Sequence, residues 1–475
     1  MKKFLLLLFF VFNLSFGQNC VNGFAGIYPC NKIDLKAHMP FSQIGGVDGG
    51  LTPTEGSGCW GWTDPLTNKE YAIMGCSTHT AFVDITNPSA PIYKGKVLAN
   101  DNTTSIWREI SVINNHALIV SETEDHGMQI FDLTRLRTVT TPQIFTEDAR
   151  YIGFGNCHTV SSNPASGYTY CNGTNLVNGG PQILNMQNPT SPVLVGSHDT
   201  DGYTHDAQIV IYDGPDPDYQ GQEIFMGANA NKVAIVNMTN KANPVTISNF
   251  TYDNNFYAHQ GWFTADKKYW ILCDELDEIN LGSNGRSIII DVTDLDNPVY
   301  KGDYFGTTRA IDHNGYIIGN DMFLASYTAG LRILNTSAIS TTNTLNEIAF
   351  FDTYPSSNGA QFNGVWNTYP FFPSGSIIMS DIDTGLFIVK KSSSLSTESF
   401  LKGSFKLSPN PANDIVTIES ENEIENIEIF DVVGKKIKSL ENLSLRFNNI
   451  DVSDLNSGVY ILKVNKLNSL KLIIE

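Results

Sequence analysis

Four of the nine histidines in this 475-residue chain recur at a nearly constant spacing. They are His158, His205, His259 and His313, which are separated by 47, 54 and 54 residues. Imidazoles that converge on one point are good ligands for Zn, Fe, Cu or Ni. The spacing therefore predicts that these four side chains meet, and a metal site built from them is one hypothesis.

Steps of similar length extend this row beyond the histidines, to Arg108 and to Trp60 or Cys59 on one side and to Asn363 on the other. Acidic and amide residues lie beside the row. We predict a polar channel lined by Arg108, Glu109, His158, His205, Asp206, His259, Gln260, His313, Asn314 and Asn363, with Asp312 as a further neighbour. The predicted metal ligands within it are the four histidines.

Two alternatives to a metal site stay open for this row. A repeating fold copies the residue that begins a given strand, so buried histidines bonded to the backbone of the next repeat would recur just as regularly. Alternatively, the channel is filled with water and takes a soluble ligand. The spacing alone does not separate these three hypotheses.

The elements that must position the row repeat as well. A short apolar strand recurs seven times, and the intervals between its third residues are 48, 53, 52, 54, 44 and 55. The copies lie at 82–84, 130–132, 183–185, 235–237, 289–291, 333–335 and 388–390. Several copies are followed by a turn rich in Asn and Pro and then another apolar run, and two further strand-like runs precede each copy. Four strands in roughly fifty residues is the unit of a β-propeller blade.

We therefore predict an all-β fold, a seven-bladed β-propeller that is closed by an N-terminal strand. The seventh copy runs into a Ser-rich segment and has no fourth strand, whereas residues 33–40 form a spare one before the first blade. Pairing the two removes the exposed edges of an open array. An open β-solenoid is the alternative, but it fits the period and the strand count poorly. The first strand of a propeller blade is innermost, which would bring the histidine row to the central channel.

The composition agrees with a protein of strands and turns. The chain has 39 Gly, 20 Pro and only 17% charged residues, and few stretches keep a helical period. Its formal net charge of -19 argues against binding to nucleic acid or to an anionic membrane surface, because both need a basic face.

The N-terminus has the pattern of an export signal. Lys2 and Lys3 precede the apolar run 4–12, and a small residue, Gly17, ends the segment, so we predict a signal peptide over 1–17. No later segment is apolar enough to predict a transmembrane helix. Export permits disulfides, and local pairs are predicted for Cys20–Cys30, Cys59–Cys76 and Cys157–Cys171, with Cys273 left as a buried thiol.

Several motifs in the body resemble a known family. The repeated strand, together with the segments 125–137, 201–208, 259–262 and 362–375, is similar to the LVIVD-repeat, choice-of-anchor B proteins. The resemblance covers roughly residues 20–391. It implies a surface or secreted protein, and it implies no particular activity.

The last 70 residues have a different composition and contain no Cys, Trp or His. Alternating strands at 415–419, 427–432 and 459–464 predict a small C-terminal β-sandwich. The segments 406–411, 429–435 and 457–464 resemble the type A sorting domain of type IX (Por) secretion. The resemblance implies contact with the type IX secretion machinery, passage across the outer membrane of a Gram-negative bacterium, and then removal of the tail with surface attachment or release. An ordinary accessory β-domain is the alternative.

The predicted domains are a signal peptide at 1–17, the propeller at 18–391, a Ser/Thr-rich linker at 392–404 and the sorting domain at 405–475. Two acidic loops, 213–221 and 274–278, are weaker candidates for Ca²⁺, since neither has EF-hand spacing. No Gly-x-Ser-x-Gly, His-Glu-x-x-His or P-loop motif occurs. We expect a secreted or cell-surface binding module with an unknown extracellular ligand. The alternative is a metal-dependent secreted enzyme, a hydrolase or an oxidoreductase, that uses the histidines.

Overall fold

The computed structural model describes residues 17–99, 104–392, 405–424, 426–431, 435–440, 443, 445–464 and 468–475. The chain divides into two compact units, residues 1–392 and 393–475. The predicted signal peptide at 1–17 and the predicted linker at 392–404 lie outside the described residues, apart from Gly17 and Ser392.

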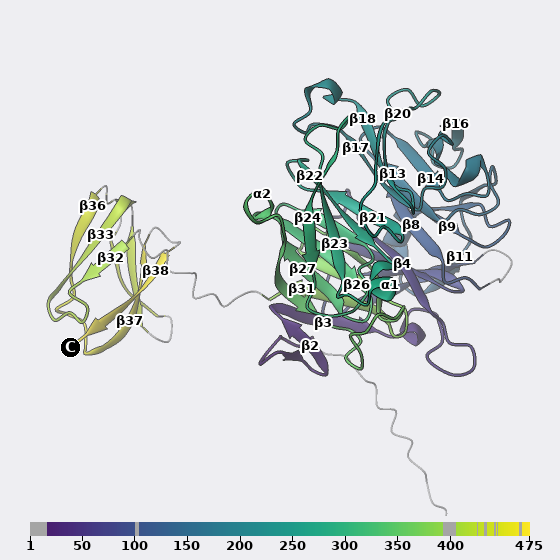
Figure 1. Ribbon diagram of the computed structural model, residues 1–475. Coiled ribbons are helices and arrows are strands. Elements are labelled where there is room, and N and C mark those ends of the chain that lie inside the picture. The colour runs from purple at the N-terminus through teal and green to yellow at the C-terminus, as the bar shows by residue number, and fades with distance from the viewer. Residues whose placement is uncertain are drawn as a thin grey trace, which may run out of the picture. The chain divides into compact units, whose positions relative to one another are not determined.

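The larger unit consists of seven antiparallel sheets, each with a core of four strands (Figure 1). Blade one holds β4 (Gly56–Thr63), β5 (Glu70–Cys76), β6 (His79–Asp84) and β7 (Ile92–Leu98), with β11 (Gln143–Phe145) parallel to β7 at its edge. Blade two holds β8 (Arg108–Ile113), β9 (His116–Ser121), β10 (Met128–Asp132) and β12 (Ala149–Tyr151). Blade three holds β13 (Thr159–Asn163), β14 (Tyr168–Asn172), β15 (Gln182–Asn185) and β16 (Val193–Ser197).

The remaining four blades follow the same order. Blade four holds β17 (Asp206–Ile211), β18 (Glu223–Ala228), β19 (Val233–Asn237) and β20 (Val245–Phe250). Blade five holds β21 (Ala258–Phe263), β22 (Tyr269–Asp274), β23 (Arg286–Asp291) and β24 (Val299–Phe305). Blade six holds β25 (Gly315–Ile318), β26 (Asp321–Ser326), β27 (Gly330–Asn335) and β28 (Asn346–Phe351), extended by β2 (Tyr28–Asn31) and β1 (Phe24–Ala25). Blade seven holds β29 (Val365–Tyr369), β30 (Ser376–Asp381), β31 (Gly385–Lys391) and β3 (Ile33–Met39).

The seven blades form a closed ring. Their first strands contact one another in the order β4, β8, β13, β17, β21, β25, β29 and back to β4. The N-terminal strand β3 pairs antiparallel with β31, so it supplies the fourth strand that blade seven lacks in sequence. The predicted seven-bladed propeller and its closure by the N-terminal strand are both confirmed.

The repeated strand of the sequence is the third strand of each blade, and its terminal Asp or Asn has a structural task. In six blades its side-chain oxygen accepts the backbone N–H two residues later, which starts the turn to the fourth strand. The six bonds run from Thr86, Thr134, Gln187, Thr239, Thr293 and Ser337 to Asp84, Asp132, Asn185, Asn237, Asp291 and Asn335. The motif therefore recurs because each blade needs the same turn.

Apolar side chains from neighbouring blades share cores. Phe82 of blade one stacks on Phe131 of blade two with ring centroids 4.6 Å apart, and both side chains are fully buried. Burial of such aromatic rings is a large part of what holds adjacent sheets face to face. The blades thus stabilise one another rather than folding as separate units.

The N-terminal segment also carries the disulfide of this unit. Cys20 and Cys30 are bonded, as predicted. The other two predicted pairs are wrong, because Cys59, Cys76, Cys157 and Cys171 are free buried thiols, as is Cys273. Cys59 faces Met74 across the β4–β5 ladder, whereas Cys76 faces Gly56, so the two sulfurs belong to different rungs.

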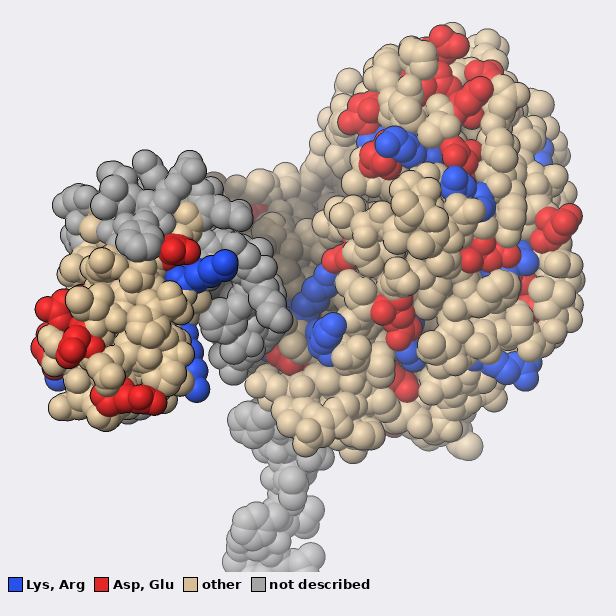
Figure 2. Space-filling view, turned by 60° about the vertical axis from the view of Figure 1, so that its left-hand side comes forward, with Lys and Arg blue, Asp and Glu red and all other residues tan. Residues whose placement is uncertain are grey.

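Helices are few and short among the described residues. They are η1 (Phe41–Gln43), η3 (Leu133–Thr138), η4 (Val177–Gly179), η5 (Pro217–Tyr219), α1 (Asp277–Leu281) and α2 (Ile339–Thr342). None of these is long and apolar enough to span a membrane. On the face of the molecule shown in Figure 2, Lys and Arg side chains are interspersed with Asp and Glu and do not gather into one patch.

The smaller unit is the predicted β-sandwich. One sheet has the order β32 (Phe405–Ser408), β33 (Ile415–Ile424) and β36 (Leu445–Asp451). The other has the order β35 (Lys436–Leu440), β34 (Ile427–Asp431), β37 (Gly458–Val464) and β38 (Asn468–Ile474). Buried residues of both sheets, among them Val416, Ile450 and Leu462, form one apolar cluster.

Candidate functional site

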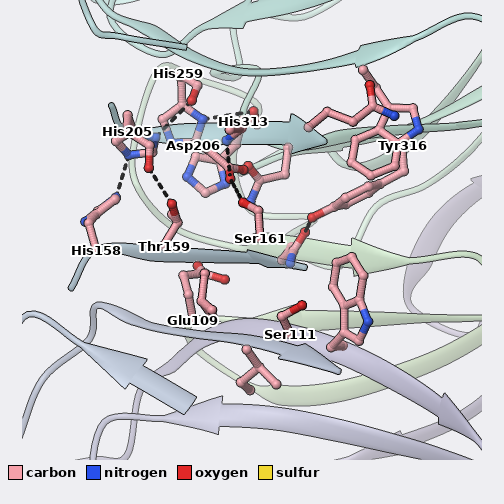
Figure 3. Close-up of a pocket in the computed structure, with 18 of the residues that line it drawn as sticks. Glu109, Ser111, His158, Thr159, Ser161, His205, Asp206, His259, His313 and Tyr316 are labelled. Atoms are coloured by element: carbon pink, nitrogen blue, oxygen red, sulfur yellow. Dashed lines mark hydrogen bonds between the residues drawn. The ribbon is translucent and has the colours of Figure 1, made fainter. Parts of the chain in front are cut away.

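A cavity of about 460 Å³ lies where the first strands of the blades meet (Figure 3). Its wall carries the whole histidine row, His158, His205, His259 and His313. These residues stand at or just before the start of the first strand in blades three to six. The backbone N–H groups of His158, His205 and His313 donate to Asn172, Ala228 and Ala325 on the second strand of the same blade. The repeat therefore delivers the row to the cavity, because one backbone position is copied from blade to blade.

The side chains of the row also bond to the backbone of the next blade. Nδ1 of His205 donates to the carbonyl oxygen of His259 at 2.9 Å, and Nδ1 of His259 donates to that of His313 at 3.2 Å. Nδ1 of His313 donates to the carbonyl oxygen of Trp366 at 2.5 Å. These contacts are what the structural hypothesis for the row predicts.

The same bonds fix the chemistry of the other ring nitrogen. A carbonyl oxygen only accepts, so Nδ1 of His205, His259 and His313 carries the proton and Nε2 of the neutral ring has a lone pair. Burial lowers the pKa of all three imidazoles, that of His313 to about 3. The three rings are therefore neutral near pH 7 and present an acceptor or metal-binding nitrogen.

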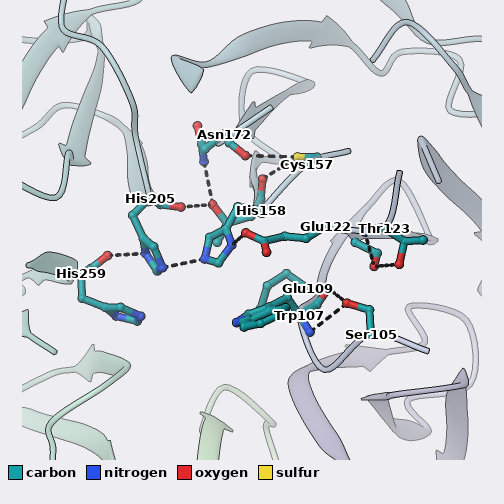
Figure 4. A network of polar contacts seen from close by, with 12 residues as sticks. Ser105, Trp107, Glu109, Glu122, Thr123, Cys157, His158, Asn172, His205 and His259 are labelled. Atoms are coloured by element: carbon teal, nitrogen blue, oxygen red, sulfur yellow. Dashed lines mark hydrogen bonds and ion pairs between the residues drawn. The ribbon is translucent and has the colours of Figure 1, made fainter. Parts of the chain in front are cut away.

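His158 is held differently from the other three (Figure 4). Its Nδ1 lies 2.6 Å from Oε1 of Glu122, and its Nε2 lies 2.6 Å from Nε2 of His205. Because Nε2 of His205 has no proton to give, the N–H in that second contact belongs to His158. The contact with Glu122 occupies the other ring nitrogen of His158, so both nitrogens of this ring have a partner.

Glu275 brings a carboxylate to the opposite part of the row. Its oxygens lie 3.7 Å from Nε2 of His259 and 3.5 Å from Nε2 of His313. The hydroxyl of Tyr327 donates to Oε1 of Glu275 at 2.8 Å. Burial raises the pKa of Glu275 to about 7. The two imidazoles and the carboxylate form a group whose ligand atoms all lie within 4.8 Å of one another.

Glu122 was not predicted to line the channel, and Glu275 was named only as part of the acidic loop 274–278, although the repeat contained a signal for both. Glu122 directly follows the second strand of blade two and Glu275 directly follows the second strand of blade five. Tyr327 has the same place in blade six. The position directly after the second strand of a blade thus also faces the cavity, in addition to the position of the histidine row at the first strand.

Two more carboxylates line the cavity beyond the histidine row. Oε1 of Glu109 accepts the indole N–H of Trp366 at 2.8 Å, and Oδ1 of Asp206 accepts the backbone N–H of Ala207 at 2.7 Å. Burial raises the pKa of Glu109 to about 7 and that of Asp206 to about 6. Both acids were predicted in the channel and both line the cavity, as does Asn314.

The part of the cavity away from the histidines has aromatic walls. Trp262 packs edge-on against Tyr316 with centroids 5.0 Å apart, and Trp60 does so at 5.9 Å. Figure 3 shows Tyr316 on the opposite side of the pocket from His158. Trp107, Tyr203, Tyr257 and Trp366 also line the cavity, and Tyr257 and Trp366 lie beside the histidines, with ring centroids 5.3 Å from His205 and 5.2 Å from His313. The site therefore combines carboxylates with aromatic side chains.

Three of the predicted channel residues lie elsewhere. Arg108 is buried between blades, where it donates to the carbonyl oxygen of Cys76 and to Nε2 of His126. Gln260 accepts the backbone N–H of Gly315, because alternate residues of a strand face opposite sides. Asn363 precedes β29 and donates to Asp383. Blade seven enters the row through Trp366 instead, since the loop before β29 shifts the equivalent position by three residues.

The two acidic loops proposed for Ca²⁺ have other partners. In the loop 274–278, Asp274 accepts from the backbone N–H groups of Phe256 and Tyr257, and Glu278 accepts from that of Arg286. Asp312, the acidic neighbour of the row, accepts from Ser287 and Ser326 and does not line the cavity.

In the loop 213–221, Asp216 already accepts the backbone N–H groups of Asp218 and Leu295. It lies close to Asp294 and Asp296, whereas Asp213 and Asp218 do not join that group. The loop 213–221 thus contributes one residue to a cluster of three acidic side chains, whereas Glu275 of the loop 274–278 faces the central cavity.

Comparison with known proteins identifies two parts of the chain. The secretion system C-terminal sorting domain of the Por type matches residues 406–475, and the LVIVD repeat matches residues 81–99. The tail therefore implies interaction with the type IX secretion machinery. The choice-of-anchor B assignment stays a prediction. No curated protein matches the chain significantly.

Solved structures with a similar fold are distant. One is PorZ, an essential bacterial surface component of the type IX secretion system of Porphyromonas gingivalis, with 11% identity and a TM-score of 0.48. The match covers 86% of this chain and 58% of PorZ. Another is Sqt1 of Saccharomyces cerevisiae, with 9% identity, a TM-score of 0.47, and 71% and 95% of the two chains covered. At these values neither protein informs the function of this one.

Proposed function

We propose that this chain, which its sorting domain sends through type IX secretion to the cell surface or the extracellular space, binds a small cationic ligand in its central cavity. The observation that carries the proposal is the charge of the wall. Four carboxylate residues line the cavity, namely Glu109, Glu122, Asp206 and Glu275, and the residues described there include no Lys or Arg.

Placing several acids in one enclosed space is unfavourable unless something positive joins them. Burial raises the pKa of Glu109, Asp206 and Glu275, which reflects the free energy needed to ionise these buried carboxyl groups. A bound cation would offset that free energy. The aromatic walls favour the same ligand, because the face of an indole or phenol ring attracts a positive charge.

Calorimetric titration of the purified protein with choline tests the proposal, in buffer with a chelator so that metal ions do not contribute. The matched control ligand is 3,3-dimethylbutan-1-ol, which has the shape of choline without its charge. We expect saturable 1:1 binding of choline that is at least ~10-fold tighter than that of the neutral analogue. Equal binding of the two, or no binding by choline, putrescine and other small amines, would contradict the proposal.

A metal-dependent secreted enzyme is the second candidate function. It is favoured by the neutral imidazoles that present Nε2 to the cavity beside Glu275, and by the contact between Glu122 and His158. Such an enzyme would turn over a substrate only after a metal ion is added. Saturable ligand binding without turnover in the presence of Zn²⁺ or Fe²⁺ would instead favour the binding protein.

A further inference from the structure

We propose that Nε2 of His259, Nε2 of His313 and the carboxylate of Glu275 bind one divalent first-row transition-metal ion. The proposal rests on the proposed function in one respect, since it names a cation that the acidic cavity takes. It differs from the four-histidine site that the sequence predicts, because it uses two of those histidines and adds a carboxylate.

The first argument is the lack of a donor among these three groups. Nδ1 of His259 and Nδ1 of His313 both donate to carbonyl oxygens, so each Nε2 has only a lone pair. Oε1 of Glu275 already accepts from Tyr327. Two imidazole nitrogens and a carboxylate, all acceptors, thus converge in a buried place. The carboxylate of Glu275 lies 3.5 Å from Nε2 of His313 and 3.7 Å from Nε2 of His259, and both distances are too long for a good hydrogen bond. A cation between them would satisfy all three.

The second argument is the size of the gap. Ligands bonded at the usual Zn–N and Zn–O lengths in a tetrahedron lie about 3.3 Å from one another. Nε2 of His313 lies 3.5 Å from Oε1 of Glu275 and Nε2 of His259 lies 3.7 Å from Oε2, and one ligand atom from each residue can be chosen so that all three lie within 4.8 Å of one another. Small side-chain movements are enough to close the site around an ion.

The third argument is the shell of residues behind the three ligands. Metal-binding histidines usually donate the other ring N–H to a carbonyl or carboxylate, which fixes the tautomer and the ring orientation. His259 donates to His313 and His313 donates to Trp366, while Tyr327 orients Glu275. Each proposed ligand thus has the kind of partner that a metal site requires.

The other two histidines of the row have different roles. Nε2 of His205 accepts the N–H of His158 at 2.6 Å, so its lone pair is already used. Both ring nitrogens of His158 are occupied, one by His205 and one by Glu122. The row therefore divides into a pair that is free to bind a metal ion and a pair that is not.

Two histidines and one carboxylate are found around catalytic zinc and around non-haem Fe(II), and in both cases coordination positions are left for water or substrate. Here those positions would face the cavity of about 460 Å³. A metal ion at this site could therefore hold a small ligand from the cavity on its open side.

The test uses the full exported protein without a polyhistidine tag, stripped with a chelator and then dialysed against Zn²⁺ or, without oxygen, Fe²⁺. We expect one ion per chain by elemental analysis. Glu275→Gln and His313→Ala should each weaken the ion's binding by at least ~100-fold, since even residues behind the ligands contribute about 10–100-fold. Tyr327→Phe should weaken it by about 10-fold. His158→Gln is the matched control and should bind the ion as the wild type does.

Glu275→Gln keeps the shape of the side chain, and a thermal melt establishes that each variant is folded. Co²⁺ in place of Zn²⁺ gives an independent measurement, because its visible spectrum reports coordination by these ligands and should change in Glu275→Gln. Failure of both Zn²⁺ and Fe²⁺ to bind would overturn the proposal, as would unchanged binding in Glu275→Gln. Equal loss of the ion in His158→Gln would also overturn it in favour of the four-histidine site. Choline binding in the presence of chelator would survive each of these outcomes, so failure of the metal site is distinguishable from failure of the proposed function.

Discussion

His205 donates from Nδ1 to the carbonyl oxygen of His259 at 2.9 Å, so a side chain of blade four is bonded to the backbone of blade five. The same ring uses its other nitrogen to accept from His158 of blade three. One imidazole thereby joins three consecutive blades at the axis of the ring. His205 therefore has a structural role, whereas Nε2 of His259 and Nε2 of His313 remain available to bind a ligand.

Removal of this link should destabilise the propeller. His205→Ala leaves the buried carbonyl of His259 without a donor, and we expect the free energy of unfolding to fall by roughly 1–3 kcal/mol. Urea denaturation followed by tryptophan fluorescence measures the change. His205→Asn should lose less, because its amide N–H can take the place of Nδ1–H. His116→Ala, at the turn between β8 and β9, is the control, and an equal loss there would contradict the role assigned to His205.

Closure of the ring by the N-terminal strand should contribute strongly to stability. Leu35 of β3 is 4% exposed and packs in the core shared by blades six and seven. Leu35→Ala should therefore lower the free energy of unfolding by about 3 kcal/mol. Leu51→Ala provides the same change at a fully exposed side chain, where we expect less than about 0.5 kcal/mol. Similar denaturation midpoints for the two variants would show that β3 is dispensable.

Binding of a cation in the cavity should strengthen as the pH rises. The pKa of Glu109 is raised to about 7, so its carboxyl is mostly protonated at pH 6 and mostly ionised at pH 8. A cation prefers the ionised form, and proton linkage then makes choline binding about 10-fold weaker at pH 6 than at pH 8. The groups that face Glu109 are Asp206, His158, Cys59, Tyr316, Tyr327 and Trp366.

Among these groups, Asp206 has a pKa raised to about 6. Its ionisation also strengthens cation binding as the pH rises, but at a lower pH than the ionisation of Glu109 does. Glu109→Gln should bind choline more weakly and should lose the part of the change between pH 6 and pH 8 that Glu109 contributes, while Glu275, whose pKa is also raised to about 7, retains the rest. Glu124→Gln, at an exposed acidic residue outside the cavity, should behave as the wild type does. Calorimetric titration at several pH values makes the comparison, and a pH profile that is unchanged in Glu109→Gln would exclude Glu109 as the group responsible.

The thiols of the exported protein should be mostly reduced. The structure contains one disulfide, Cys20–Cys30, and five free buried cysteines. Thiol titration of the unfolded protein should therefore give five reactive groups, and two more after reduction. The same titration of the folded protein should give almost none, because burial protects the thiols and raises the pKa of Cys59 and Cys76 to about 12. A count of three thiols in the unfolded protein would restore one of the two other pairs predicted from sequence, and a count of one would restore both.

Much of the fold was predictable because a propeller is periodic. In six blades the turn that follows the third strand has an Asp or Asn that accepts a backbone N–H, and this requirement is visible in the sequence as a repeat. The missing fourth strand of blade seven and the spare strand at 33–39 were visible for the same reason. That Cys59 and Cys76 do not form a disulfide was not predictable, since a register shift in the β4–β5 ladder decides which residues face each other.

The candidate site was predictable only where it followed the period. His158, His205, His259 and His313 occupy one repeated position, whereas the loop before β29 moves the corresponding residue of blade seven from Asn363 to Trp366. Glu275 comes from a turn after a second strand, so no spacing within the histidine row points to it.

By itself, the sequence determined the number of blades, the closure of the ring, the sorting tail and the level at which the histidines meet. Each of these depends on a local pattern, which either recurs in every blade or lies at one end of the chain. Only the tertiary structure decided which nitrogen of each imidazole is free. That depends on the distance from each ring to the carbonyl of the next blade and to Glu122 or Glu275, which lie far away in sequence. Hydrogen bonds across the axis thus divide four equivalent histidines into two chemically different pairs.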